Sequence, residues 1–278
     1  MKLLICKVCT LLSDSYLNLP RLVPMVNASP GLIWSFFSLA IAIAAAFVVA
    51  VHASAGHTTR SSARRGTLLA ALATATWLAV TLALAASGRL SFTSRPPTAG
   101  VLIAVGVGLA IAVGTSRLGA RLATGIPLAA LIGVHAFRFP LELMLHRAYR
   151  EGLMPVQMSY SGFNFDILTG LSAIVVALYI ARRRPNAVAV ARIWNAAGIV
   201  LLANILTIAV LSTPTPIRVF HNEPANEWIA HAPWVWLPAV FVVAAIVGHI
   251  VIFRRLRYES RARGRAPRGV AAAIEAVS

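Results

Sequence analysis

Long uncharged apolar segments alternate with short polar connections along most of the chain. A helix needs about 20 apolar residues to cross a hydrocarbon core about 30 Å thick. Seven segments meet this requirement or approach it, and the fifth is the shortest. They cover residues 32–54, 66–87, 98–115, 122–146, 166–181, 193–212 and 233–253. The pattern predicts an all-α fold, a polytopic bundle of about seven transmembrane helices within residues 25–256.

Arginine clusters occupy every second connection between these segments. Three arginines lie between the first and second, two between the third and fourth, four between the fifth and sixth, and seven after the last. Because connections rich in Lys and Arg stay on the cytoplasmic side, this side is predicted to be cytoplasmic. An odd number of helices then places the N-terminus outside. Four tryptophans fall at the predicted outer ends, as expected of an aromatic belt: Trp34, Trp228, Trp234 and Trp236.

The composition agrees with a membrane protein. Only 12% of the 278 residues are charged, whereas soluble domains carry about 25%. The net charge of +17 comes almost wholly from arginine, since the only lysines are Lys2 and Lys7. These charges lie between apolar runs and are not interleaved with stacking aromatic residues, so we expect the lipid bilayer and no nucleic acid as a partner. The lack of lysine in the predicted helices excludes a retinal Schiff base.

The two ends of the chain differ from the bundle. Residues 1–24 do not resemble a signal peptide, because Lys7 interrupts their apolar stretch and no small-residue cleavage site follows. We interpret them as an N-terminal extension that is dispensable or wrongly assigned to the protein, and the start of translation, Met1 or Met25, stays open. Residues 257–278 are polar and rich in arginine, which predicts a basic, disordered cytoplasmic tail.

The fourth segment carries four ionisable residues toward its outer end: His135, Arg138, Glu142 and His146. At about 100° per residue they fall within about 80° of one another on one helix face. A charge within the hydrocarbon costs a few kcal/mol unless it faces a cavity or a partner. We therefore expect this face to point into the bundle and form a site. The alternative is that Arg138 and Glu142, four residues apart, simply neutralise each other.

The outer connections add further candidates. Asp166 begins the fifth segment, where an acid either caps the helix or joins the site. The connection 147–165 before it is too polar to span and is expected to lie in the interface or fold back over the bundle. His249 falls near the inner end of the last segment, far from this cluster.

The connection after the sixth segment is predicted to begin a short interfacial helix at Glu223 and Pro224. It contributes four polar candidates on the same membrane side: Arg218, His221, Asn222 and Glu223.

Two stretches, HAFRFPLELMLHRAYREGLMPVQMSYSGFNFDILTG (135–170) and TPTPIRVFHNEPANEWIAHAPWVWLP (213–238), resemble a family of uncharacterised bacterial multi-pass membrane proteins. The resemblance covers about half the chain, from the fourth segment onward. It implies a protein of the bacterial cytoplasmic (inner) membrane. It does not indicate an activity, a cofactor or a catalytic residue. Membrane zinc hydrolases of the alkaline ceramidase type share the predicted layout, but their H-x-x-x-H pair is absent from the last segment. Common hydrolase and nucleotide-binding motifs are absent as well.

Three functions remain open. In the first, which we favour, an outer-facing cavity binds or transports a small polar or anionic ligand through Arg138 and its neighbours. In the second, a membrane-embedded enzyme uses Glu142 with His135, His146 or His221 as general acid and base, or it uses a divalent metal. The candidate metal ligands are His135, Glu142, His146 and His221. In the third, an accessory subunit uses the polar network only to fix helix packing. The sequence leaves activity, cofactor and oligomeric state undetermined.

Overall fold

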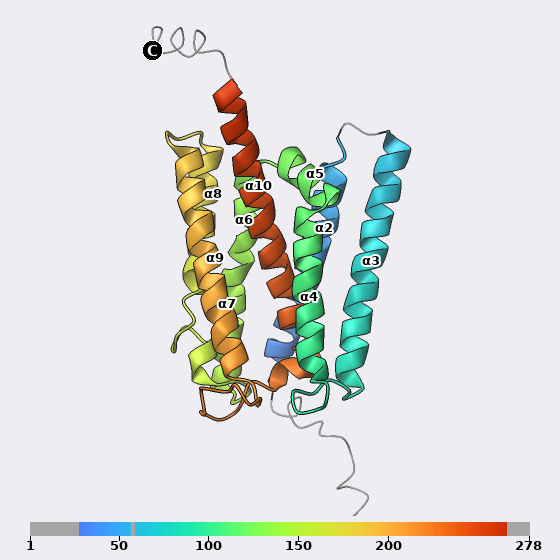
Figure 1. The fold of residues 1–278 in the computed structure, drawn as a ribbon, viewed down its shortest axis with the longest axis vertical. Helices are drawn as coiled ribbons and strands as arrows, with labels where there is room; N and C mark the ends of the chain where they lie inside the picture. The colour runs from blue at the N-terminus through green and yellow to red at the C-terminus, as the bar shows by residue number, and fades with distance from the viewer. Residues whose placement is uncertain (1–27, 57–58, 266–278) are drawn as a thin grey trace, which may run out of the picture.

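The computed structural model describes residues 28–56 and 59–265, and within these ranges it is all-helical, as predicted (Figure 1). Six helical segments are long and apolar enough to cross a membrane. They are α2 (Pro30–Ala53), α3 (Arg60–Ala86), α4 (Thr98–Thr115), the composite segment Leu128–Arg150, α9 (Ala187–Leu211) and Leu237–Arg261. A shorter apolar helix, α8 (Ile167–Ala181), packs beside them. The predicted extension, 1–24, lies outside the described residues.

The outer faces of the helices carry apolar side chains. Leu68 of α3 is 63% exposed, and Val200 of α9 is 66% exposed. Only Thr81 and Ala85 of α3 are buried, so this helix stands at the edge of the bundle (Figure 1). Extended apolar surfaces of this kind are rare on soluble monomers. Together with the six apolar helices, they indicate a membrane protein.

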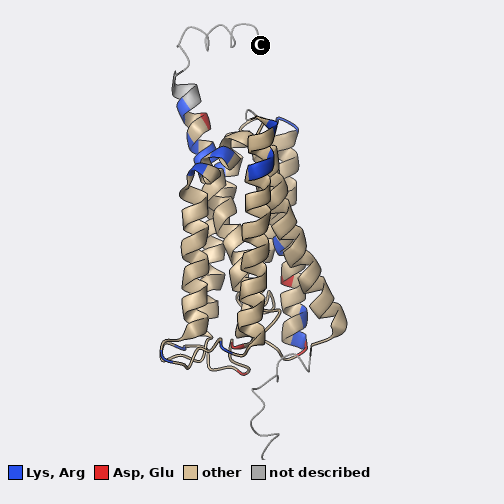
Figure 2. Ribbon diagram, turned by 90° about the vertical axis from the view of Figure 1, so that its right-hand side faces the viewer, with Lys and Arg blue, Asp and Glu red and all other residues tan. Residues whose placement is uncertain are grey.

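Charge is distributed unequally between the two ends of the bundle. Figure 2 shows Lys and Arg gathered at the end where the last helix leaves the bundle, while the opposite end carries both signs. We call the first the basic end. It contains the turn 182–186 after α8 and the short helix α5 (Arg117–Gly125).

The fourth predicted span is interrupted, and it begins later than the sequence suggested. Ser116 caps α5 by accepting bonds from the backbone of Leu118 and Gly119, and the chain breaks again at Pro127, which has no N–H to continue a helix. The membrane-length segment then consists of α6 (Leu128–Gly133), the 3-10 turn η1 (Val134–Phe137) and α7 (Arg138–Arg150). The predicted start at Leu122 was therefore wrong by six residues, or about 9 Å of helix.

The last span begins with a π-helical turn, η4 (Leu237–Val242), and continues as α10 (Val243–Arg265). Pro238 provides no backbone donor in this turn. The indole of Trp77 on α3 donates to the Ala239 carbonyl over 2.8 Å and so attaches the edge helix to η4. Wider turns of this type occur where an α-helix takes up an extra residue.

At the basic end, arginines of α10 donate hydrogen bonds to carbonyl oxygens at the ends of α4 and α5. Arg254 Nη1 donates to the carbonyl oxygens of Gly114 and Ser116, at 2.8 and 2.9 Å, which satisfies the end of α4. Arg255 pairs with Glu259 one turn later, at 2.8 Å. The helix continues through Arg265, so the disordered tail predicted from residue 257 starts inside a helix, and residues 266–278 lie outside the described part.

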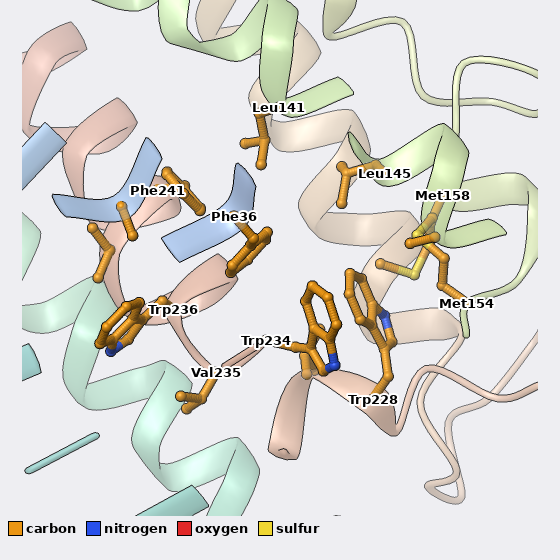
Figure 3. Packing of buried hydrophobic residues seen from close by; sticks show 14 of the residues in the cluster. Phe36, Leu141, Leu145, Met154, Met158, Trp228, Trp234, Val235, Trp236 and Phe241 are labelled. Carbon is orange, nitrogen blue, oxygen red and sulfur yellow. The ribbon is translucent and has the colours of Figure 1, made fainter. Parts of the chain in front are cut away.

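Three of the four predicted belt tryptophans are buried instead of facing lipid. Trp34 is 69% exposed, but Trp228, Trp234 and Trp236 are at most 3% exposed. Trp234 packs on Trp228 and Phe36, with ring centroids 5.1 and 5.0 Å apart (Figure 3). The connection after α9 folds inward here, because its apolar side chains pack against α2 and α7. Its helical turn is η3 (Trp228–Ala230), so the helix predicted to start at Glu223 and Pro224 does not form.

Candidate functional site

A cavity of about 410 Å³ lies among α4, α7, α9, η4 and α10, in the half of the bundle away from the basic end. Its wall is almost wholly apolar and includes Ile103, Leu141, Leu202, Ile205, Leu206 and Phe241. Three ionisable residues line it, Arg138, Glu142 and Asp166. The connection after α9 covers one end with residues such as Thr213 and Asn226. The cavity is thus a mainly hydrophobic chamber with one polar region.

The polar region is built around an ion pair between α7 and α8. Arg138 Nε lies 2.7 Å from Asp166 Oδ2, and the two side chains are 2% and 7% exposed. The helices approach closely because Gly170 of α8 lies directly against the backbone of Phe139, where a Cβ would overlap it. Asp166 precedes α8 but makes no capping bond with its side chain. Arg138 Nη2 and Asp166 Oδ1 have no hydrogen-bond partner within the described residues.

Glu142 is held by the connection between α7 and α8, not by Arg138. Its Oε2 accepts from Asn164 Nδ2 over 2.7 Å, and the same amide also donates to the Met158 carbonyl. Asn164 Oδ1 accepts the backbone N–H of Asp166 at 3.0 Å. Asn164 and Gln157 are at most 2% exposed, so the connection folds back into the bundle, with the short turn η2 (Val156–Met158) inside it. The neutralisation of Arg138 by Glu142 that sequence spacing allowed is replaced by the pairing with Asp166.

His249 of α10 joins the cluster, although the sequence placed it far away. Its Nε2 lies 3.1 Å from Arg138 Nη1, and its Nδ1 lies 2.9 Å from Asn195 Oδ1. Arginine can only donate, so Nε2 accepts and the ring proton is on Nδ1, which donates to Asn195. The Asn195 amide in turn donates to the His249 carbonyl over 3.3 Å. Gly198 makes room for the ring, since a Cβ there would lie 2.6 Å from Cε1.

The misplacement of His249 follows from the bounds of two spans. The fourth span begins at Leu128, so Arg138 lies about 15 Å from its start. The last span continues past Phe253 to Arg261, so His249 lies about 18 Å from its end. The two residues therefore lie at similar distances from the basic end. Asn195, a polar residue within an apolar segment, was a signal that sequence reasoning did not use.

His135 is completely buried beside this chain of bonds. Its ring centroid lies 4.4 Å from that of His249 and 5.4 Å from that of Trp194. A Cβ on Gly248 would overlap the His135 ring, so this glycine is required by the packing. Neither ring nitrogen has a hydrogen-bond partner in the described ranges, and the ring does not line the cavity.

The remaining candidates lie outside this cluster. His146 is half-buried, stacks on Tyr160 at 4.4 Å and contacts Ser161 Oγ through Nδ1 at 3.1 Å. Arg218 donates to the carbonyls of Phe220 and Asn222 and to the Glu223 carboxylate, so it holds its own loop together. Three loop candidates are exposed: His221, Asn222 and Glu223. None of the five lines the cavity.

The residues considered as metal ligands are likewise not gathered. In the part of the chain that the structure describes, no three His, Cys, Asp or Glu side chains come together so that they could hold a metal ion. His135 and Glu142 lie within the bundle, whereas His146 and His221 lie apart from them. The arrangement instead provides an apolar chamber, a neutralised ion pair with one free donor and one free acceptor, and a histidine behind it.

No curated protein and no solved structure matches the chain. One family model does match, that of a domain of unknown function, DUF8737, over residues 96–257, which is more than half of the chain. The matched region contains Arg138, Asp166, Asn195 and His249, and every residue that lines the cavity except Phe92. Helices α2 and α3 precede it. The chain therefore belongs to the DUF8737 family of domains of unknown function.

Proposed function

We propose that the chain is a seven-span protein of the bacterial cytoplasmic membrane, with the N-terminus outside and the C-terminus in the cytoplasm. In this topology α8 crosses the membrane in addition to the six longer segments and is the fifth crossing along the chain. The 15 residues of α8 extend about 22 Å, less than a hydrocarbon core. The folded-back connection before α8 supplies the remaining depth, and irregular backbone is tolerated there because it is buried in protein. The arginines of the basic end support the orientation.

The proposed function of this scaffold is to bind a small amphiphilic molecule. The observation that carries this proposal is the cavity of about 410 Å³, whose apolar wall meets Arg138, Glu142 and Asp166. Its size and lining suit a ligand with a hydrophobic body and one polar head group. A purely structural polar network would leave neither a cavity nor unpaired buried donors and acceptors, and this chain has both.

The electrostatics of the polar region favour an uncharged head group. Arg138 is already neutralised by Asp166, and Glu142 brings a second carboxyl group to the same wall. An anion would gain little from the paired arginine and would meet both acids. A hydroxyl, amide or protonated carboxyl group would instead accept from Arg138 Nη2 and donate to Asp166 Oδ1. We therefore replace the polar or anionic ligand favoured from sequence with a neutral amphiphile.

Photochemical labelling in lipid nanodiscs tests the proposal. Three diazirine probes share one alkyl chain and carry an alcohol, a carboxylate or a quaternary ammonium head group. We expect the alcohol to label cavity residues such as Ile103 and Leu206 at least about tenfold more than the charged probes do, a difference of about 1.4 kcal/mol in binding. Peptide mapping by mass spectrometry locates the adducts.

Two neighbouring substitutions on α4 provide the control. Ala104 lines the cavity, whereas Val105 is 51% exposed and does not. Ala104→Trp should abolish labelling of the cavity, and Val105→Trp should preserve it. Equal labelling of the two variants would mean that the probe reacts from the surrounding lipid, and the proposed binding function would be rejected.

A further inference from the structure

A second hollow, of about 230 Å³, lies at the basic end between α9 and α10. Its lining consists of Arg192 on α9 and of Phe253, Leu256, Arg257, Ser260 and Arg261 on α10. The α10 residues recur every three or four positions, so they share one face of the helix. We call this hollow the arginine groove. It shares no lining residue with the cavity described above.

The groove concentrates positive charge without an acidic partner. Arg192 Nη2 donates to Ser260 Oγ over 3.0 Å, which holds this arginine across the groove. The neighbouring acid, Glu259, is paired with Arg255 and does not line the groove. None of the three lining arginines forms an ion pair with a described residue. Three guanidinium groups that line one hollow repel one another, and a bound anion would relieve that repulsion.

Exposed apolar side chains lie next to these arginines, farther from the basic end. Phe253 is 51% exposed, and the Arg257 guanidinium carbon lies 5.4 Å from its ring centroid. Ile193, beside Arg192, is 72% exposed. Phe253 precedes Arg261 by eight residues, which is about 12 Å along the helix. Charge therefore lies toward the basic end and apolar surface toward the membrane interior, in the order of a phospholipid headgroup and its acyl chains.

We propose that the arginine groove binds the phosphate headgroup of an anionic phospholipid, with the lipid's acyl chains along Phe253 and Ile193. Guanidinium groups match phosphate oxygens in charge and geometry, and basic pockets at membrane helices are suited to anionic lipids. A free phosphate ion would use the arginines alone and leave the adjoining apolar surface unoccupied. The proposed orientation places this site in the cytoplasmic leaflet, and only that placement rests on it. The amphiphile cavity is not involved.

Native mass spectrometry of the delipidated full chain in detergent tests this site. The probes are phosphatidylglycerol and phosphatidylcholine with the same acyl chains. We expect at least one phosphatidylglycerol to bind about tenfold more tightly than phosphatidylcholine. The double variant Arg257→Gln, Arg261→Gln should lose this preference. The side chains of both arginines are exposed, so we expect the variant to keep the melting temperature of the wild type.

The matched control is Arg64→Gln, Arg65→Gln, which removes two exposed arginines of α3 and the same charge. It should retain the preference for phosphatidylglycerol. Equal loss in both double variants would overturn the proposal in favour of general charge attraction. No preference in the wild type would overturn it outright. Complete displacement of the lipid by millimolar inorganic phosphate would also overturn it and would identify a soluble anion site.

Discussion

Arg138 Nε and Asp166 Oδ2 lie 2.7 Å apart in the interior of the bundle, and they connect α7 to the start of α8. Through Arg138 Nη1 the same guanidinium contacts His249 of α10. A buried charge is tolerated only with a partner, so each member of the pair depends on the other. This relationship organises the polar region of the cavity, and it makes the site sensitive to single substitutions.

Removal of either charge should therefore destabilise the protein more than removal of both. We expect Arg138→Gln and Asp166→Asn each to cost about 3–5 kcal/mol, because the remaining charge is buried without its partner. The double variant should recover part of this loss. Melting temperatures in detergent, followed by tryptophan fluorescence, provide the measurement.

Glu223→Gln in the surface ion pair with Arg218 is the control for this cycle, since the Glu223 side chain is 73% exposed. Neutralising this exposed carboxylate should change the melting temperature little. If the Arg138 and Asp166 effects simply added in the double variant, the two side chains would not be coupled.

Gly198 should not tolerate a methyl group. A Cβ there would lie 2.6 Å from the His249 ring, whereas one on Gly108 of α4 would meet nothing within 4 Å. We expect Gly198→Ala to destabilise the protein by about 1–3 kcal/mol through overpacking. Gly108→Ala should be neutral or slightly stabilising, because alanine favours a helix. Thermal unfolding compares the two, and equal effects would show that the packing around His249 is not tight.

Glu151, beyond the end of α7, should make stability depend on pH. It accepts bonds from Ser29 N, Ser29 Oγ and Arg147 Nε at 2.7, 2.6 and 2.8 Å. Burial raises its pKa, but the hydrogen bonds outweigh burial and hold the pKa below its usual range. The stabilisation is therefore complete above the ordinary glutamate pKa and is lost as the pH falls through the lowered value.

The matching experiment compares wild type with Glu151→Gln across that range of pH. At neutral pH the variant should be less stable by about 1–3 kcal/mol, since hydrogen bonds to a charged group are lost. The gap should close in acid, where the wild-type carboxylate becomes protonated. A gap that stays constant with pH would contradict the role of the charge.

The seven-span topology predicts that α8 separates two loops on opposite membrane faces. In a chain with Cys6→Ser and Cys9→Ser, single cysteines replace Ser161 before α8 and Arg183 after it, both exposed positions. An impermeant maleimide should label Ser161→Cys in intact spheroplasts, and Arg183→Cys only after permeabilisation. If both positions react before permeabilisation, α8 does not cross the membrane.

Sequence alone was sufficient for the properties that depend on local composition. Six predicted spans correspond to long apolar helices, because the ability to cross a membrane depends on about 20 neighbouring residues. The gathering of arginines at one end was visible for the same reason. The inward direction of Arg138 and Glu142, each 1% exposed, also follows from a local rule, since a charge in an apolar helix avoids lipid.

Only the tertiary structure decided which polar groups meet. Arg138 pairs with Asp166 and not with Glu142 because Gly170 lets α8 approach α7. His249 reaches Arg138 because the break at Pro127 shifts the fourth span by about 9 Å and the last span continues past Phe253 to Arg261. Sequence periodicity describes the faces of one helix at a time, whereas these contacts depend on the relative depth and spacing of separate helices. Those are set by helix breaks, small residues and a folded-back connection, whose combined effect appears only in the assembled bundle.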